Sequence, residues 1–127
     1  MQSKYWLACA VAILPSTVRA TVTEDTFKLQ TTSDLVELCS TPPSDPMGTA
    51  ALNFCHGFAL GVYRVLIEEN AAKRTHTLCP PNPGPSRNQA VADFVQWAKG
   101  DPAIMQQPPA DGIAAYIQKT FACPRGK

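Results

Sequence analysis

Residues 52–66 read LNFCHGFALGVYRVL, and this stretch decides the fold. Apolar residues recur through it and beyond it at spacings of three and four, which is the period of an α-helix. One row consists of Leu52, Cys55, Ala59, Val62 and Leu66, and a second row beside it consists of Ala51, Phe54, Phe58, Gly61 and Val65. The only continuous polar stripe is Asn53, Gly57, Arg64 and Glu68. We expect a helix from about residue 46 or 49 to residue 70 that is covered on most sides and is central to the fold.

Two glycines lie one turn apart in this helix, at Gly57 and Gly61. Such a pair lets another backbone approach closely, and in lipid it would favour a helix dimer. Arg64 argues against a membrane span, because a mid-span arginine costs about 2.5–3.5 kcal/mol on the insertion scale. We therefore expect Gly57 and Gly61 to pack against another helix of the same bundle.

Three further helices are predicted around this one. Residues 31–34 are helix-capping types, with Glu37 as the capping-box partner of Asp34, and a short helix follows to about Cys39. Ser86 and Gln89 form the same signal before a third helix, which ends at Gly100.

Ile104 and Met105 suit a short docked turn, and a last helix is expected over residues 110–121. Residues 21–30 are ambiguous and are expected to form a mobile N-terminal arm. No segment has the sustained period of two that a strand needs. The sequence predicts a small all-α bundle of about four helices.

The first twenty residues have the form of an export signal. Lys4 precedes a ten-residue apolar core at residues 5–14, Pro15 breaks it, and residues 18–20 (VRA) suit cleavage before Thr21. The core is shorter than the ~20 residues that a span needs. A retained anchor and a lipoprotein using Cys9 are the alternatives, but Cys9 follows Lys4 too closely for the second. We expect a signal peptide at 1–20, the arm at 21–30 and one helical domain at 31–127, in a periplasmic protein.

Charge limits the partners of the mature chain. Removing Lys4 and Arg19 from the 11 basic residues leaves nine against ten acidic residues, a net charge of −1. This balance favours neither nucleic acid nor an anionic membrane.

Four cysteines remain after the predicted cleavage, at positions 39, 55, 79 and 123. An even number behind an export signal indicates two structural disulfides, for which three pairings exist. We favour Cys39–Cys55, because a helical hairpin would bring these two together. Cys79–Cys123 would then tie the C-terminus to the middle loop and staple the bundle.

No catalytic, metal or cofactor site is evident. The sequence has no H-E-x-x-H, G-x-S-x-G, C-x-x-C or phosphate-binding glycine loop. His56 directly follows Cys55, but adjacent helical residues point about 100° apart and do not face each other. His76 lies in a loop, where solvation is its ordinary state. We expect a protein that is not an enzyme.

The order of these motifs resembles that of a known family. A short helix ending in cysteine precedes CHGFALGV at residues 55–62, LCPP at 78–81 follows, and FACP at 121–124 ends the pattern. Together with Asp101-Pro102 and Pro108-Pro109, this resembles the Rap/Tai immunity proteins of type VI secretion systems, over residues 35–124. The resemblance implies a small periplasmic helical protein, often dimeric, that binds a cell-wall amidase toxin and blocks its active site.

Contact residues do not follow from such a resemblance, because it rests on cysteines, glycines and core positions. We expect a partner to contact the loop over residues 73–86 or the one over 101–109. The polar candidates are Arg74, His76, Asn82 and Arg87. The segment over residues 80–85 is richer in proline than the family pattern leads us to expect, and binding to a toxin could differ there.

A periplasmic chaperone or stress protein, resembling the small acid-stress chaperones, is the alternative function. It would bind many unfolded clients through surface exposed at low pH. The sequence has only two histidines, and histidine is the side chain that changes charge near pH 6, so a conformational switch at that pH has few groups to drive it. An amidase gene beside this one would favour immunity.

Overall fold

The computed structural model describes residues 22–124, so the predicted signal peptide lies outside the described residues. The described part is all-α, as the sequence predicts, and its one β-bridge joins Leu78 to Ala122. Its elements, in chain order, are a 3-10 helix η1 (Glu24–Lys28) and the α-helices α1 (Thr32–Ser40), α2 (Gly48–Ala71), α3 (Arg87–Lys99), α4 (Pro102–Met105) and α5 (Pro109–Thr120).

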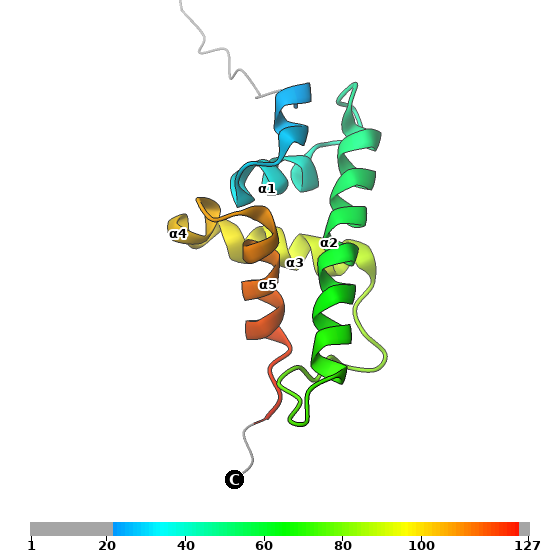
Figure 1. Cartoon of the computed structure of the whole chain (residues 1–127). Helices are drawn as coiled ribbons and strands as arrows, with labels where there is room; N and C mark the ends of the chain where they lie inside the picture. The colour runs from blue at the N-terminus through cyan, green and yellow to red at the C-terminus, as the bar shows by residue number, and fades with distance from the viewer. Residues whose placement is uncertain (1–21, 125–127) are drawn as a thin grey trace, which may run out of the picture.

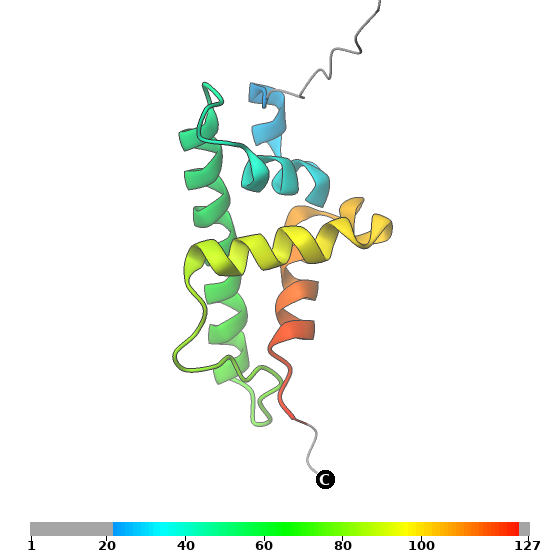
Figure 2. The same ribbon diagram turned by 180° about the vertical axis from the view of Figure 1, so that it is seen from behind.

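The long α2 and the shorter α5 run alongside each other, and α3 crosses both (Figures 1 and 2). Helix α1 lies across one end of this arrangement and contacts α2, α3 and α5. The core lies where α1, α3 and α5 meet, with Leu35, Phe94, Ala98, Ile113 and Ile117 all buried there. Burial of these apolar faces is the main force that holds the helices together.

The start of α1 fixes its crossing with α5. Thr31 is the N-cap, and Asp34 occupies the third helical position, where its Oδ2 accepts from the Thr31 N–H at 2.9 Å. The capping box therefore begins three residues earlier than Asp34, and the predicted role of Glu37 is wrong. Thr32 is fully buried and its Oγ1 donates to the Gln107 carbonyl at 3.0 Å. A Cβ added to Gly112 of α5 would collide with this Thr32 side chain.

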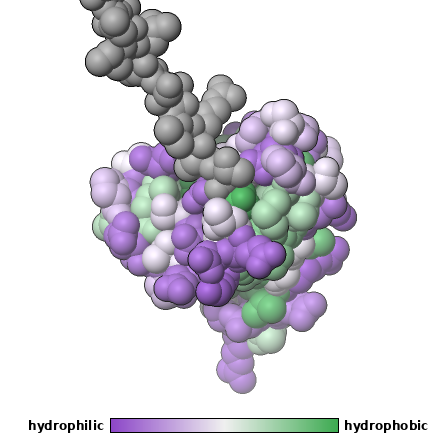
Figure 3. Space-filling view, turned by 90° about the horizontal axis from the view of Figure 1, so that it is seen from above, coloured by the Kyte–Doolittle hydropathy of each residue, from purple (hydrophilic) through white to green (hydrophobic). Residues whose placement is uncertain are grey.

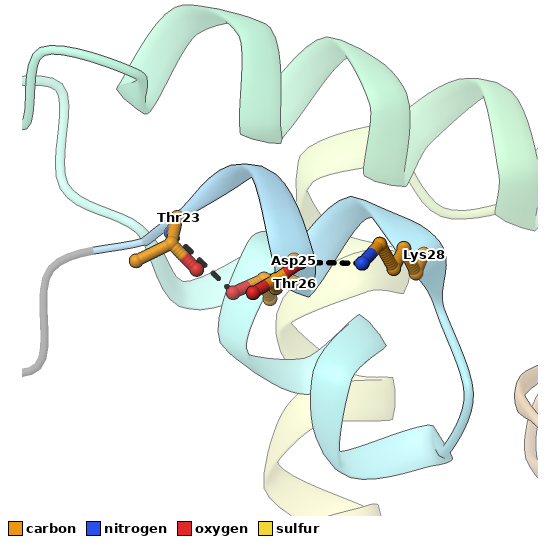
Figure 4. Close-up of polar contacts among 4 residues, drawn as sticks. All are labelled: Thr23, Asp25, Thr26 and Lys28. Atoms are coloured by element: carbon orange, nitrogen blue, oxygen red, sulfur yellow. Dashed lines mark hydrogen bonds and ion pairs between the residues drawn. The ribbon is translucent and has the colours of Figure 1, made fainter.

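The N-terminal segment is structured, so the prediction of a mobile arm is wrong for residues 22–30. Val22 is 4% exposed and packs with Leu38 and Ala51 in a second small cluster. In η1, the Thr23 N–H donates to Thr26 Oγ1 at 3.4 Å and Lys28 pairs with Asp25 at 2.6 Å (Figure 4). The apolar residues of this segment are too few to give a period. Packing against α1 and α2 buries Val22 and half-buries Phe27 and Leu29.

Helix α2 lies on a flank of the molecule and is not its central element. Only Gly48, Ala51, Cys55 and Asn70 are buried along its 24 residues. Phe54 is 39% and Val65 is 55% exposed. The first apolar row is buried or half-buried as predicted. The prediction is wrong for most of the second row, because Phe54, Gly61 and Val65 lie on the side of α2 that the other helices do not cover.

Gly57 and Gly61 are both exposed, and a Cβ added at either would meet no atom within 4 Å. The prediction that another helix of the same chain packs against them is therefore wrong. The small residues lie on the uncovered side of α2, between Phe54 and Val65.

Helix α2 is long and apolar enough to cross a bilayer by length and composition alone, and 11% of its most apolar window is buried in the described structure. Arg64 lies within this helix and is exposed. The end of the molecule near η1 has polar side chains over its centre with apolar areas beside them (Figure 3). Among the described residues, the large apolar side chains that are exposed, Phe54 and Val65, lie on α2.

Both disulfides join the predicted cysteines. Cys39 at the end of α1 is bonded to Cys55 in α2, with a Cα–Cα distance of 5.3 Å. Cys79 is bonded to Cys123 at 4.8 Å between Cα atoms. The first bond closes the α1–α2 hairpin, and the second ties the C-terminal segment to the loop between α2 and α3.

Candidate partner-binding surface

The loop over residues 72–86 joins α2 to α3 at the end of the molecule opposite η1 (Figure 1). Except for Leu78, which is buried, and Pro80, which is half-buried, its residues are exposed. A loop of this length without a helix of its own is uncommon in a compact domain and is often functional. Two anchors divide it into a first arm at residues 72–76 and a second arm at residues 80–86.

Asn70 is the first anchor. It is 7% exposed, and its side chain satisfies the backbone of the returning chain. Its Oδ1 accepts from the N–H groups of Thr77 and Leu78 at 2.8 and 3.0 Å, and its Nδ2 donates to the Leu78 carbonyl at 3.0 Å. The last turn of α2 therefore holds the far end of the first arm. The sequence shows only an asparagine near a helix end, so this role could not be predicted from it.

The C-terminal segment is the second anchor. The Cys79 N–H donates to the Phe121 carbonyl at 2.7 Å, and the Cys123 N–H donates to the Thr77 carbonyl at 3.0 Å. The Cys79–Cys123 disulfide adds a covalent bond at the same place. Because hydrogen bonds and a disulfide hold both arms at their bases, the loop projects from a rigid support.

The four predicted contact residues are all exposed and fall on three parts of this surface. Arg74 and His76 lie on the first arm, Asn82 lies on the second arm, and Arg87 begins α3. No hydrogen bond or ion pair within the described range joins any of these four side chains to another residue. They are therefore free to meet a partner.

The other predicted loop, residues 101–109, is docked on the bundle. Asp101 caps α4, its Oδ1 accepting from the Ala103 N–H at 2.9 Å. The Thr32 N–H donates to the Gln107 carbonyl at 2.7 Å, and Pro109 is buried. This segment offers less free surface than residues 72–86.

The sulfur of Cys55 is fully buried and bonded to Cys39, so it cannot serve as a nucleophile for the adjacent His56. His56 Nε2 is buried and has no hydrogen-bond partner among the described atoms. Over residues 22–124, no group of three histidine, cysteine or acidic side chains is placed to hold a metal ion.

A disulfide-stapled helical bundle that presents an exposed loop, anchored at both arms, has the build of a protein-binding module. The chain belongs to the family of Rap1a immunity proteins, whose pattern matches residues 31–123. Membership implies a toxin protein as the binding partner, and it agrees with the resemblance seen in the sequence. Comparison with curated proteins and with solved structures gave no match.

Proposed function

We propose that the protein is exported to the periplasm, where it binds and silences one peptidoglycan amidase delivered by a type VI secretion system. The observation that carries this proposal is the family match over residues 31–123, together with the anchored loop. Two disulfides fit an oxidising compartment, and an export signal over residues 1–20 fits the same destination.

The first arm of the loop is the part that we expect to enter the amidase cleft. Arg74 and His76 are exposed there, and Asn70 and Cys79 fix the backbone on the C-terminal side. Little conformational entropy is lost when a loop held in this way binds, and this preorganisation favours tight inhibition.

Co-expression in cells tests the proposal. An amidase encoded by a neighbouring gene, directed to the periplasm, should lyse cells, and the full-length chain should rescue them. Deleting residues 1–20 should abolish the rescue, because the protein would then remain on the other side of the membrane. Lysis that continues despite full expression of the exported chain would contradict the proposal. Suppressed aggregation of unrelated proteins at acid pH would instead indicate the chaperone function.

We further propose that two copies form a dimer through the uncovered side of α2. Phe54, Gly57, Gly61 and Val65 follow one another at spacings of three and four, so they share one exposed face. Small residues at its centre allow two helices to approach closely, with larger apolar side chains on both flanks.

An antiparallel pairing suits this face. A two-fold axis on the exposed face, at the height of Ala59 along α2, places Gly57 of one copy opposite Gly61 of the other and brings Arg64 toward the ring of Phe54. A parallel pairing would instead place Arg64 of one copy opposite Arg64 of the other, and the two positive charges would repel each other. Light scattering of the mature protein should give twice the monomer mass at tens of micromolar, and a monomer mass would contradict the dimer.

A further inference from the structure

A cavity of about 210 Å³ lies between α2, α3 and α5, under the proline-rich second arm of the loop. Its lining includes the exposed Pro81, Gly84 and Arg87, which surround the mouth. Phe94 and Ile117 also line it and are 2% and 4% exposed, so they form the floor. The cavity therefore opens from the surface into the core of the bundle.

The wall of this cavity is almost entirely apolar. Ala59, Leu60, Val91 and Ile113 contribute carbon atoms between the mouth and the floor. An engineered cavity of about 150 Å³ with a similar lining stays dry and binds benzene. The cavity in this protein is larger, so it has room for a ring or short chain that exceeds benzene in size.

Four polar side chains line the cavity, those of His56, Tyr63, Arg87 and Tyr116, and only Arg87 carries a permanent charge. Burial, and then the nearby Asp93, raise the pKa of Tyr116, so its phenol is neutral at neutral pH. His56 contributes an imidazole whose Nε2 has no partner. Arg87 supplies the guanidinium, and no carboxylate is among the described residues that line the wall.

We propose that this cavity binds a small amphiphile: an apolar body, aromatic or alkyl, that carries a carboxylate. The body would fill the space above Phe94 and Ile117, and the carboxylate would meet Arg87 at the mouth. The site is independent of the proposed immunity function, because it requires no toxin.

A matched pair of probes distinguishes binding of the apolar body from binding of the carboxylate. Para-toluate and para-tolylmethanol share one ring and methyl group, and only the first carries a carboxylate. Titrating either into the mature protein should shift the methyl resonances of Ile113 and Ile117 in a saturable manner. Arg87→Gln should weaken binding of para-toluate roughly threefold, as expected for an exposed ion pair, and leave that of the alcohol unchanged.

Two variants that replace an alanine by leucine test where the probes bind. Ala59→Leu fills the cavity and should abolish binding of both probes, whereas Ala92→Leu adds the same volume on an exposed part of α3 and should leave binding intact. Circular dichroism confirms that each variant is folded. The proposal is overturned if neither probe gives saturable shifts, or if Ala59→Leu binds both as well as the parent does. Equal weakening of both probes by Arg87→Gln would overturn the carboxylate assignment.

Discussion

At the scale of single residues, Asn70 stabilises the loop through three hydrogen bonds of 2.8–3.0 Å to the backbone of Thr77 and Leu78. Replacing it by alanine leaves the buried Leu78 N–H and carbonyl without these partners. Asn70→Ala should therefore lower the free energy of unfolding by about 2 kcal/mol. Urea denaturation measures this loss, and amide exchange at Leu78 should accelerate. Asn88→Ala, on the exposed first turn of α3, is the control and should change stability by less than about 0.5 kcal/mol. Equal effects of both variants would contradict the anchor role.

Gly112 is required for the close crossing of α1 and α5. A Cβ there would collide with Thr32, which is fully buried and cannot move aside. Gly112→Ala should destabilise the protein by about 1–3 kcal/mol despite the higher helix propensity of alanine. A double-mutant cycle with Thr32→Ala checks the cause, since the added methyl should cost less once that side chain is shortened. Additive losses would show that the two residues do not compete for space.

Residues with a strong local signal were predictable from sequence. The pairing of Cys39 with Cys55 was predicted from a helical hairpin that brings them together, and both disulfides have the predicted partners. Ser86 caps α3 as predicted, accepting from the Gln89 N–H at 3.2 Å, but the Gln89 side chain donates to Asp93 and does not complete the predicted capping box. Asn70 and Gly112 have no such signal. The partners of Asn70 follow it only after the first arm of the loop, and Gly112 meets Thr32, which is distant in sequence. The proposed contact residues were named from position in a loop, and the structure adds their common exposure.

At the scale of elements, the two disulfides contribute through the loops that they close. Their partners are 16 and 44 residues apart, and the chain-entropy relation gives about 3 and 4 kcal/mol for such loops. We expect the double variants Cys39→Ala/Cys55→Ala and Cys79→Ala/Cys123→Ala to lose at least these amounts in guanidinium denaturation. A loss below about 1 kcal/mol for either pair would contradict a structural role for that bond.

Helix boundaries were predicted to within a few residues for α2, α3 and α5, because periodicity and caps are local features. The position of α2 was not. Its apolar rows indicate that the helix needs cover, but they do not identify what covers it. The same limit explains the N-terminal arm, since Val22 and Thr26 become buried only by docking on other helices.

At the scale of the whole molecule, Gly61 tests the dimer separately from the fold. Gly61→Leu adds a side chain where the monomer has open space, so the helix content and the fold should be retained. The same side chain would block close approach of a second α2. Light scattering should therefore show a monomer for Gly61→Leu and a dimer for Ala92→Leu, which alters an exposed position on α3. A dimeric Gly61→Leu would place the interface elsewhere.

Two double variants, one in the loop and one in α3, test whether the first arm contacts the amidase. Arg74→Ala/His76→Ala removes the two polar groups of the first arm, and Gln96→Ala/Lys99→Ala removes two exposed polar groups from α3 as a control. None of these four residues is buried, so the free energy of unfolding of each double variant should be within about 0.5 kcal/mol of that of the parent protein.

The central claim is tested most directly by measuring hydrolysis of cell-wall peptide by the purified neighbouring-gene amidase, with and without the purified mature protein. We predict that an equimolar amount of the protein stops hydrolysis, that Arg74→Ala/His76→Ala raises the inhibition constant at least tenfold, and that Gln96→Ala/Lys99→Ala leaves it unchanged. Full amidase activity in the presence of excess mature protein would contradict the account.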